Sequence, residues 1–293
     1  MPYLDTVTSI ALFGVAYAMV LYLISVGLSI TMGLLGIANL AHGAFAMLGG
    51  YTMVLLAQRI GLPFWAALIG AFVLVAALGA LLERTLFSRL RAADELEETL
   101  LSIGLIFMAM AAAHYVFGPA AIRVDVPAGL RSQIRIPGAS VELPAYRALL
   151  VAIGVAVFAG LVLLFRGTGM GARIRATVDN AAMAQSIGID TNRLFTLVFA
   201  FGTGLAAVGG ALGAEILPLA PAYPAEYLTL FLMVVAVGGV GSLVGPFVAA
   251  LILGISDTAC KVLAPDFAAF FVYLLMFTLL LLRPSGILVK DVP

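Results

Sequence analysis

The residue types that most often carry out chemistry in proteins are scarce in this sequence. Its single cysteine is Cys260, and its two histidines, His42 and His114, lie far apart along the chain. A metal site needs three or four ligands, and these residues form no ligand motif. The sequence also contains no P-loop and no hydrolase or zinc-protease motif. We therefore expect no catalytic residue, no metal, no cofactor and no ATPase site in this chain.

Charged and polar residues gather instead in one segment, residues 166–193, which reads RGTGMGARIRATVDNAAMAQSIGIDTNR. It holds four arginines and two aspartates, and apolar runs flank it on both sides. We predict a short helix from about Ile174 to Ile187 that ends at Gly188, because glycine readily adopts the positive φ that follows many helices. Such a helix offers a surface that a partner protein could hold. The alternative is a solvated connecting helix.

The composition of the whole chain is that of a membrane protein. Of its 293 residues, 63% are hydrophobic and 10% are charged, and the mean hydropathy is +1.18. Soluble domains average about 45–50% apolar and about 25% charged residues. The net charge of zero argues against nucleic acid as a partner. No lysine or arginine precedes the first apolar run, so we expect this run to be retained and not cleaved as a signal peptide.

The apolar runs predict the membrane-spanning elements, since a helical crossing needs about 20 apolar residues. The runs lie near residues 9–30, 35–57, 62–82, 98–117, 147–165, 194–214, 227–243, 244–263 and 267–283. We predict an all-α polytopic membrane protein with about eight to nine transmembrane helices, forming a single domain over residues 1–293. Glycines interrupt the runs near 35–57 and 227–263, which predicts re-entrant or discontinuous helices there.

The arginines and lysines set the expected orientation, because cytoplasmic loops carry the excess of basic residues. The loop near residues 83–98, the segment 166–193 and the C-terminal tail together hold nine of the fifteen basic residues. Placing these three inside makes residues 166–193 a cytoplasmic loop and residues 118–146 an extracytoplasmic loop. With nine spans the N-terminus lies outside and the C-terminus inside, whereas with eight both lie inside.

The loop at residues 118–146 alternates apolar and polar residues on either side of the turn sequences PAG and PGAS. Alternation of this kind predicts one or two small β-hairpins. An irregular capping loop is an equal alternative.

Two glycine-rich segments share a design: GLLGIANLAHGAFAMLGGY at residues 33–51 and GGVGSLVGPFVAALILG at residues 238–254. Each precedes an apolar run directed outward, and glycine-interrupted segments at corresponding positions in two halves indicate a pathway across the membrane. Close helix packing through small residues is the alternative. In the first segment Asn39 and His42 lie one helical turn apart. We expect them to cap a broken helix rather than to touch a solute.

These segments resemble a known family, the permeases of branched-chain amino acid ABC importers. Residues 39–43 (NLAHG) resemble the family's N-F-A-H-G, residues 238–245 (GGVGSLVG) match G-G-x-G-S-x-x-G, and residues 283–286 (RPSG) match R-P-x-G. The resemblance runs from about Gly27 to Gly286 and is closest to the LivH-type subunit. It assigns to the pathway or its motifs Asn39, His42, Gly43, Gly238, Gly239, Gly241, Ser242 and Gly245.

The resemblance also implies partners and a mechanism. A second homologous permease would complete the pathway, two cytoplasmic ATP-binding subunits would drive it, and an extracytoplasmic solute-binding protein would deliver the amino acid. The host membrane would be the bacterial cytoplasmic (inner) membrane. Residues 166–193 would be the coupling loop, because residues 182–188 follow the importer pattern E-A-A-x-x-x-G without its glutamate. The residues expected to contact the ATPases are Arg173, Arg175, Asp179, Ala182, Ala184 and Gly188.

Two alternatives remain open at the level of sequence. Ala44 stands where the family often has an acidic residue, which would fit a permease for another small solute, such as an amide or urea, and a sugar-importing permease of the broader superfamily is a related alternative. A stand-alone secondary transporter or channel is the other alternative. Ion coupling usually needs charged residues inside the membrane, and they are nearly absent here away from the ends of the spans. Asp257 and Lys261, four residues apart, are expected to pair with each other.

Overall fold

The computed structural model describes residues 2–36, 39–90, 95–135, 141–284 and 286–288, and this part of the chain is mainly α-helical. Seven of its helices are long and apolar enough to cross a membrane. They are α1 (Pro2–Leu35), α3 (Phe64–Leu82) with its continuation, α5 (Glu95–Phe117), α6 (Ala145–Gly167), α9 (Thr191–Gly213), α11 (Val244–Leu263) and α12 (Ala268–Leu282) with the 3-10 turn η4 (Pro265–Phe267) before it. The chain is therefore a polytopic helical membrane protein, as its composition predicts.

Two apolar helices are shorter than these seven. The run near 35–57 forms α2 (His42–Val54) and the π-helix η1 (Leu55–Arg59), and α2 begins only after a break that follows α1. The run near 227–243 forms α10 (Tyr223–Gly238), which starts four residues earlier than expected, with Pro224 in its first turn. Proline is tolerated there because the first-turn N–H groups lack helical acceptors. These two runs therefore each form a short helix, whereas the run near 244–263 forms the long helix α11.

The remaining elements are brief. The π-helix η2 (Glu83–Phe87) and α4 (Ser88–Leu90) continue α3, and α7 (Gly169–Asp179) and α8 (Ala181–Ser186) form the polar segment. The 3-10 turn η3 (Ala128–Leu130) precedes β1 (Gln133–Arg135) and β2 (Glu142–Pro144), which pair antiparallel with Ile134 opposite Leu143. The predicted hairpin is thereby confirmed, although its PGAS turn lies largely within 136–140, outside the described residues.

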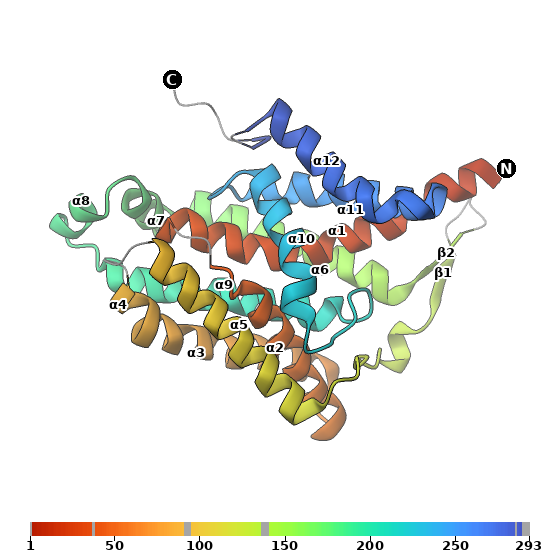
Figure 1. Cartoon of the computed structure of the whole chain (residues 1–293), viewed down its shortest axis with the longest axis horizontal. Coiled ribbons are helices and arrows are strands. Elements are labelled where there is room, and N and C mark those ends of the chain that lie inside the picture. Colours follow the sequence, from red (N-terminus) through yellow and green to blue (C-terminus); the bar gives the residue numbers. More distant parts are fainter. Residues whose placement is uncertain (1, 37–38, 91–94, 136–140, 285, 289–293) are drawn as a thin grey trace.

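The core is built around α1 and α9. In each of these helices 72% of an 18-residue apolar stretch is buried within the protein, against 17% in α5 and α6 and 11% in α12. Figure 1 shows α1 running through the middle of the bundle along its long axis. The outer helices therefore carry the surface that faces lipid.

Small residues let the inner helices approach closely. A Cβ added to Gly27 of α1 would overlap the carbonyl oxygen of Gly202 in α9, and one added to Gly49 of α2 would overlap the backbone of Ala207 in α9. Without a hydrophobic driving force between helices in lipid, such close packing is a main source of association. The α1, α2 and α9 contacts consequently depend on the absence of side chains.

The two ends of the bundle differ. Figure 1 shows α7 and α8 at one end, and the start of α1 with the β1–β2 hairpin at the other. At the hairpin end Arg135 pairs with Glu142 at 2.9 Å. Near the C-terminal end of α11, Lys261 Nζ lies 2.6 Å from Asp257 Oδ2, so the predicted ion pair on one helix face is confirmed.

The packing analysis predicts that Gly49→Ala destabilises the protein. The added methyl has to displace the backbone of α9, and overpacking of this kind costs about 1–3 kcal/mol. Gly104→Ala in α5 is the matched control, because a Cβ there meets no atom within 4 Å. In thermal unfolding of the detergent-purified protein, Gly49→Ala is expected to lower the midpoint and Gly104→Ala to leave it unchanged or raise it. Equal midpoints for the two variants would contradict this packing.

Candidate functional site

The polar segment consists of two helices, and the prediction of one helix over 174–187 is wrong. Asn180 breaks it: the residue is extended, with φ −158° and ψ 102°, and its side-chain oxygen accepts a hydrogen bond from the Met183 N–H at 2.9 Å. Asparagine side chains compete with the helical hydrogen-bond ladder and favour helix N-caps. Gly188 has φ +89°, so the predicted glycine turn after the helix is confirmed.

The helix α7 is attached to the membrane-spanning helices. Its buried face holds Gly171, Ile174 and Thr177, and a Cβ on Gly171 would overlap the Phe165 carbonyl oxygen near the end of α6. Arg175 Nη1 donates a hydrogen bond to that same carbonyl at 2.5 Å. The last carbonyls of a helix lack internal donors. Arg175, expected at the rim of a partner contact, therefore joins α7 to α6.

The helix α8 projects from the bundle and exposes large apolar side chains. Met183 is 64% exposed and Ile187 is 69% exposed, whereas Ala184 is 1% exposed. Ala184, expected on the contact surface, thus faces inward, while Arg173, Asp179, Ala182 and Gly188 lie on the surface. Two large apolar side chains thus project from a segment that is otherwise mainly polar. Ile187 was not among the expected contacts, although its apolar side chain beside Gly188 was a usable signal.

A hollow of about 470 Å³ lies between α7, the loop after α8 and the start of α9. It brings Arg173 and Gly188 of the expected coupling residues to one surface. Its lining residues are Met170, Arg173, Ile187, Gly188, Ile189, Asp190, Arg193, Leu194 and Leu197.

The two glycine-rich segments meet at the end of α1. A Cβ on Gly33 would overlap Gly241, the Gly241 N–H donates to the Ser29 carbonyl at 3.3 Å, and the Ser29 hydroxyl donates to the Ser242 carbonyl at 3.0 Å. Gly241 has φ +76°. Gly239, at the start of the same turn, has φ +94°. The two segments are thus in direct backbone contact at Gly33 and Gly241.

The third motif packs at the same place. A Cβ on Gly286 would come within 2.6 Å of the Gly239 Cα, and the Ile287 N–H donates to the Val237 carbonyl at 2.8 Å. Gly238 and Gly245 likewise lie in backbone contact, at the turn between α10 and α11. We call this meeting point of the ends of α1 and α10, the start of α11 and the chain after α12 the glycine junction.

The NLAHG residues lie apart from the glycine junction, at the start of α2. His42 is fully buried and its Nε2 lies 2.9 Å from the Ile24 carbonyl in the middle of α1. The Asn39 side-chain oxygen accepts from the Ala41 N–H at 3.1 Å. Gly43 packs against Pro224 at the start of α10. Asn39 thus orders the chain before α2, whereas His42 joins α2 to α1 and caps neither helix.

The comparison with protein families decides what this arrangement belongs to. The family described as branched-chain amino acid transport system / permease component matches residues 10–280, which include both glycine-rich segments and the α7–α8 segment. The chain belongs to this permease family.

Individual proteins that are similar to this chain are named as permeases of the same kind. This permease is 28% identical to the high-affinity branched-chain amino acid transport system permease protein LivH of Escherichia coli K12, over 94% of this chain and 93% of the relative. It is 26% identical to BraD of Pseudomonas aeruginosa, a permease protein of the same kind of system, over 91% and 90%. A solved structure titled PsaBC from Streptococcus pneumoniae in complex with Fab is 14% identical, covers 92% and 89%, and gives a TM-score of 0.49.

The glycine junction of the permease predicts a role for Ser242 in stability. Its hydroxyl oxygen accepts a hydrogen bond from the Gly245 N–H at 2.9 Å, at the start of α11. Loss of such a cap costs about 0.5–2 kcal/mol. Ser242→Ala is therefore expected to lower the thermal unfolding midpoint, and Ser242→Asn, which keeps an acceptor oxygen, is expected to recover most of the loss. An alanine variant as stable as the parent would show that this hydrogen bond is unimportant.

Proposed function

We propose that this permease is the membrane-spanning subunit of an ABC importer that carries branched-chain or related amino acids across the bacterial cytoplasmic membrane. The observation that carries the proposal is the family match over residues 10–280. The relatives named for branched-chain amino acid transport match over more than nine-tenths of this chain and support the substrate class. A second homologous permease, two cytoplasmic ATPase subunits and an extracytoplasmic binding protein complete the importer.

The proposed topology has nine crossings. The seven long helices account for seven, and the short helices α2 and α10 add two, each completed by non-helical chain. Irregular backbone at membrane depth is tolerated where protein buries it, and the chain at the starts of both short helices is buried. The N-terminus and the hairpin then lie outside, and α7, α8 and the glycine junction lie inside.

The segment α7–α8 is the proposed coupling element. Met183 and Ile187 supply the apolar contact, and Arg173, Asp179, Ala182 and Gly188 surround it, since interfaces combine an apolar centre with a polar rim. Arg175 joins α7 to the end of α6. ATP binding favours the closed ATPase dimer, and the differential affinity of ATP for that state is the driving force. Movement of α8 would reach α6 through the Arg175 contact.

The glycine junction is proposed to act by packing, and the solute to pass at the interface with the second permease. Gly33 and Gly241 are in backbone contact with each other. The turn between α10 and α11 is built from or contacted by Gly238, Gly239, Ser242 and Gly245. Close-packed contacts have discrete arrangements. The junction would therefore switch as a unit between inward-open and outward-open states.

The coupling proposal predicts that Met183→Asp releases the ATPases. With a tag on this chain and the whole operon expressed, co-purified ATPase is expected to fall about tenfold or more, because a central apolar contact contributes about 2 kcal/mol or more. Gly188→Arg is expected to act in the same direction. The second permease should remain in both preparations.

The matched control is Ile134→Asp, which places the same charge on an exposed apolar residue of the hairpin at the other end of the molecule. It is expected to leave the amount of bound ATPase unchanged. If Ile134→Asp releases the ATPases and Met183→Asp does not, the proposed orientation is reversed. If neither variant changes the complex, α8 is not the docking element.

A further inference from the structure

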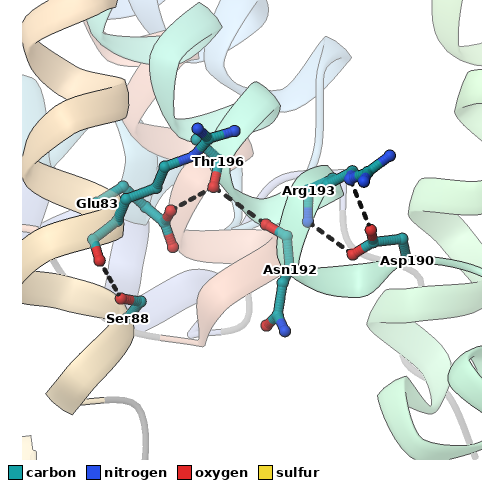
Figure 2. A pocket seen from close by; sticks show the side chains of 7 residues that line it. Glu83, Ser88, Asp190, Asn192, Arg193 and Thr196 are labelled. Atoms are coloured by element: carbon teal, nitrogen blue, oxygen red, sulfur yellow. Dashed lines mark hydrogen bonds and ion pairs between the residues drawn. The ribbon is translucent and has the colours of Figure 1, made fainter.

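Glu226, in the first turn of α10, is an exposed carboxylate on a membrane helix. No described residue forms a hydrogen bond or an ion pair with its side chain. The buried carboxylates of the bundle are different, because Asp257 pairs with Lys261 and Glu83 accepts the Thr196 hydroxyl, as Figure 2 shows. The charge of Glu226 is therefore not compensated within this chain.

The position of Glu226 along α10 places it inside the membrane. The helix ends at Gly238, in the glycine junction, which is cytoplasmic in the proposed topology. Glu226 precedes Gly238 by twelve residues, which corresponds to about 18 Å of helix at about 1.5 Å per residue. Since the hydrocarbon core is about 30 Å thick, the backbone of Glu226 lies about 12 Å short of its outer edge.

The contacts at the start of α10 agree with this depth. Leu219, just before the helix, is fully buried, and its carbonyl accepts a hydrogen bond from the Ile122 N–H of the 118–146 loop at 2.8 Å. Pro224 packs against Gly43, and the neighbouring His42 reaches the middle of α1. The helix therefore begins beneath the loop and not at the outer surface.

One face of α10 is left open by the rest of the chain, whereas the other faces contact α1, α2 and α11. Its residues are spaced three and four apart, as on a single helix face. We call them the Glu226 face: Ala225, Glu226 and Thr229, which are exposed, and Leu232 and Ala236, which are half-buried. The face is polar at Glu226 and Thr229 and apolar toward the cytoplasmic end.

Lipid is a poor neighbour for this face. A carboxylate in the first turn gains from the helix dipole, but less than a charge loses in hydrocarbon. Snorkelling to the membrane surface is a property of the long lysine and arginine side chains. Charged residues within membrane helices face the bundle interior or a water-filled cavity, and they mark substrate and ion pathways.

We propose that the Glu226 face lines the solute pathway at the interface with the second permease, and that the Glu226 carboxylate receives the α-ammonium of the amino acid. An ammonium and a carboxylate form a charge-assisted hydrogen bond, and Glu226 has no internal partner that competes for it. The aliphatic side chain of the solute then meets Leu232 and Ala236. This inference rests on the proposed importer function and adds a residue that contacts the solute.

The first test measures whether water reaches the Glu226 face in the complete complex, held in lipid nanodiscs. The variants are Thr229→Cys and, as the matched control, Thr278→Cys on the outermost helix α12, both with Cys260→Ala because Cys260 is the only cysteine. A permanently charged methanethiosulfonate is expected to label Thr229→Cys about tenfold or more faster, since a charged reagent does not enter hydrocarbon. Thr278 lies nearer the end of its helix than Thr229 does, so depth favours the control.

The second test measures the effect of the charge on ATP-driven leucine uptake into proteoliposomes that contain the complete complex. Glu226→Gln is expected to lower uptake about tenfold or more, because one charged hydrogen bond to the ammonium is lost. Glu226→Asp keeps the charge and should retain more uptake than Glu226→Gln. The matched control Glu142→Gln removes an exposed carboxylate of the hairpin, whose surface pair with Arg135 contributes little, and it should transport like the parent.

Equal labelling of the two cysteines, or parent-like uptake by Glu226→Gln, would overturn the proposal. Loss of the second permease from a tagged Glu226→Gln preparation would overturn it as well, because the carboxylate would then be a subunit contact. A parent complex that does not take up leucine with ATP would count against the importer function instead. The labelling comparison needs no transport, so it would still decide whether the Glu226 face meets water.

Discussion

Backbone contact between α1 and α9, the two buried helices, is the constraint on which the rest of this permease depends. A side chain at Gly27 would overlap the carbonyl of Gly202, so the two helices pack at a separation that larger residues exclude. Lipid offers no hydrophobic driving force between helices, and packing has to supply the association. The other helices then arrange around this pair, with α2 and α11 against it and α5 and α12 outermost.

Close backbone packing also determines the structure at the end of the molecule that is cytoplasmic in the proposed orientation. At the glycine junction three motif segments meet through backbone atoms, and the serine hydroxyls of Ser29 and Ser242 complete their hydrogen bonds. The polar segment is different, because it is fixed to α6 by Arg175 while α8 extends outward with Met183 and Ile187 exposed. One end of the molecule therefore combines a tightly packed junction with a protruding helix suited to a partner.

The sequence was sufficient wherever a periodic or local signal controls the structure. The long apolar runs gave the positions of the seven spans, the alternation near Ile134 gave the hairpin, and the spacing of Asp257 and Lys261 gave their ion pair. The glycine after α8 was also correctly identified from its conformational freedom.

One of the incorrect predictions comes from a local side-chain cap, and the others come from contacts between segments. A side-chain cap at Asn180 outweighed the helical pattern of residues 174–187, and Ala184 is buried instead of exposed. His42 found its partner in the middle of α1, 18 residues earlier. The hydrogen bond between Thr196 and Glu83 joins residues that are 113 positions apart, so no local motif predicts it.

The most direct test of the central claim, that separate ATPases drive this permease, is uptake of radiolabelled leucine into proteoliposomes. The vesicles would contain the complete complex, with the binding protein outside and ATP trapped inside. Uptake is expected with ATP, and it should be absent with a non-hydrolysable analogue and insensitive to a proton ionophore. Uptake by this chain alone, without ATP or partner subunits, would contradict the claim and identify a stand-alone transporter or channel.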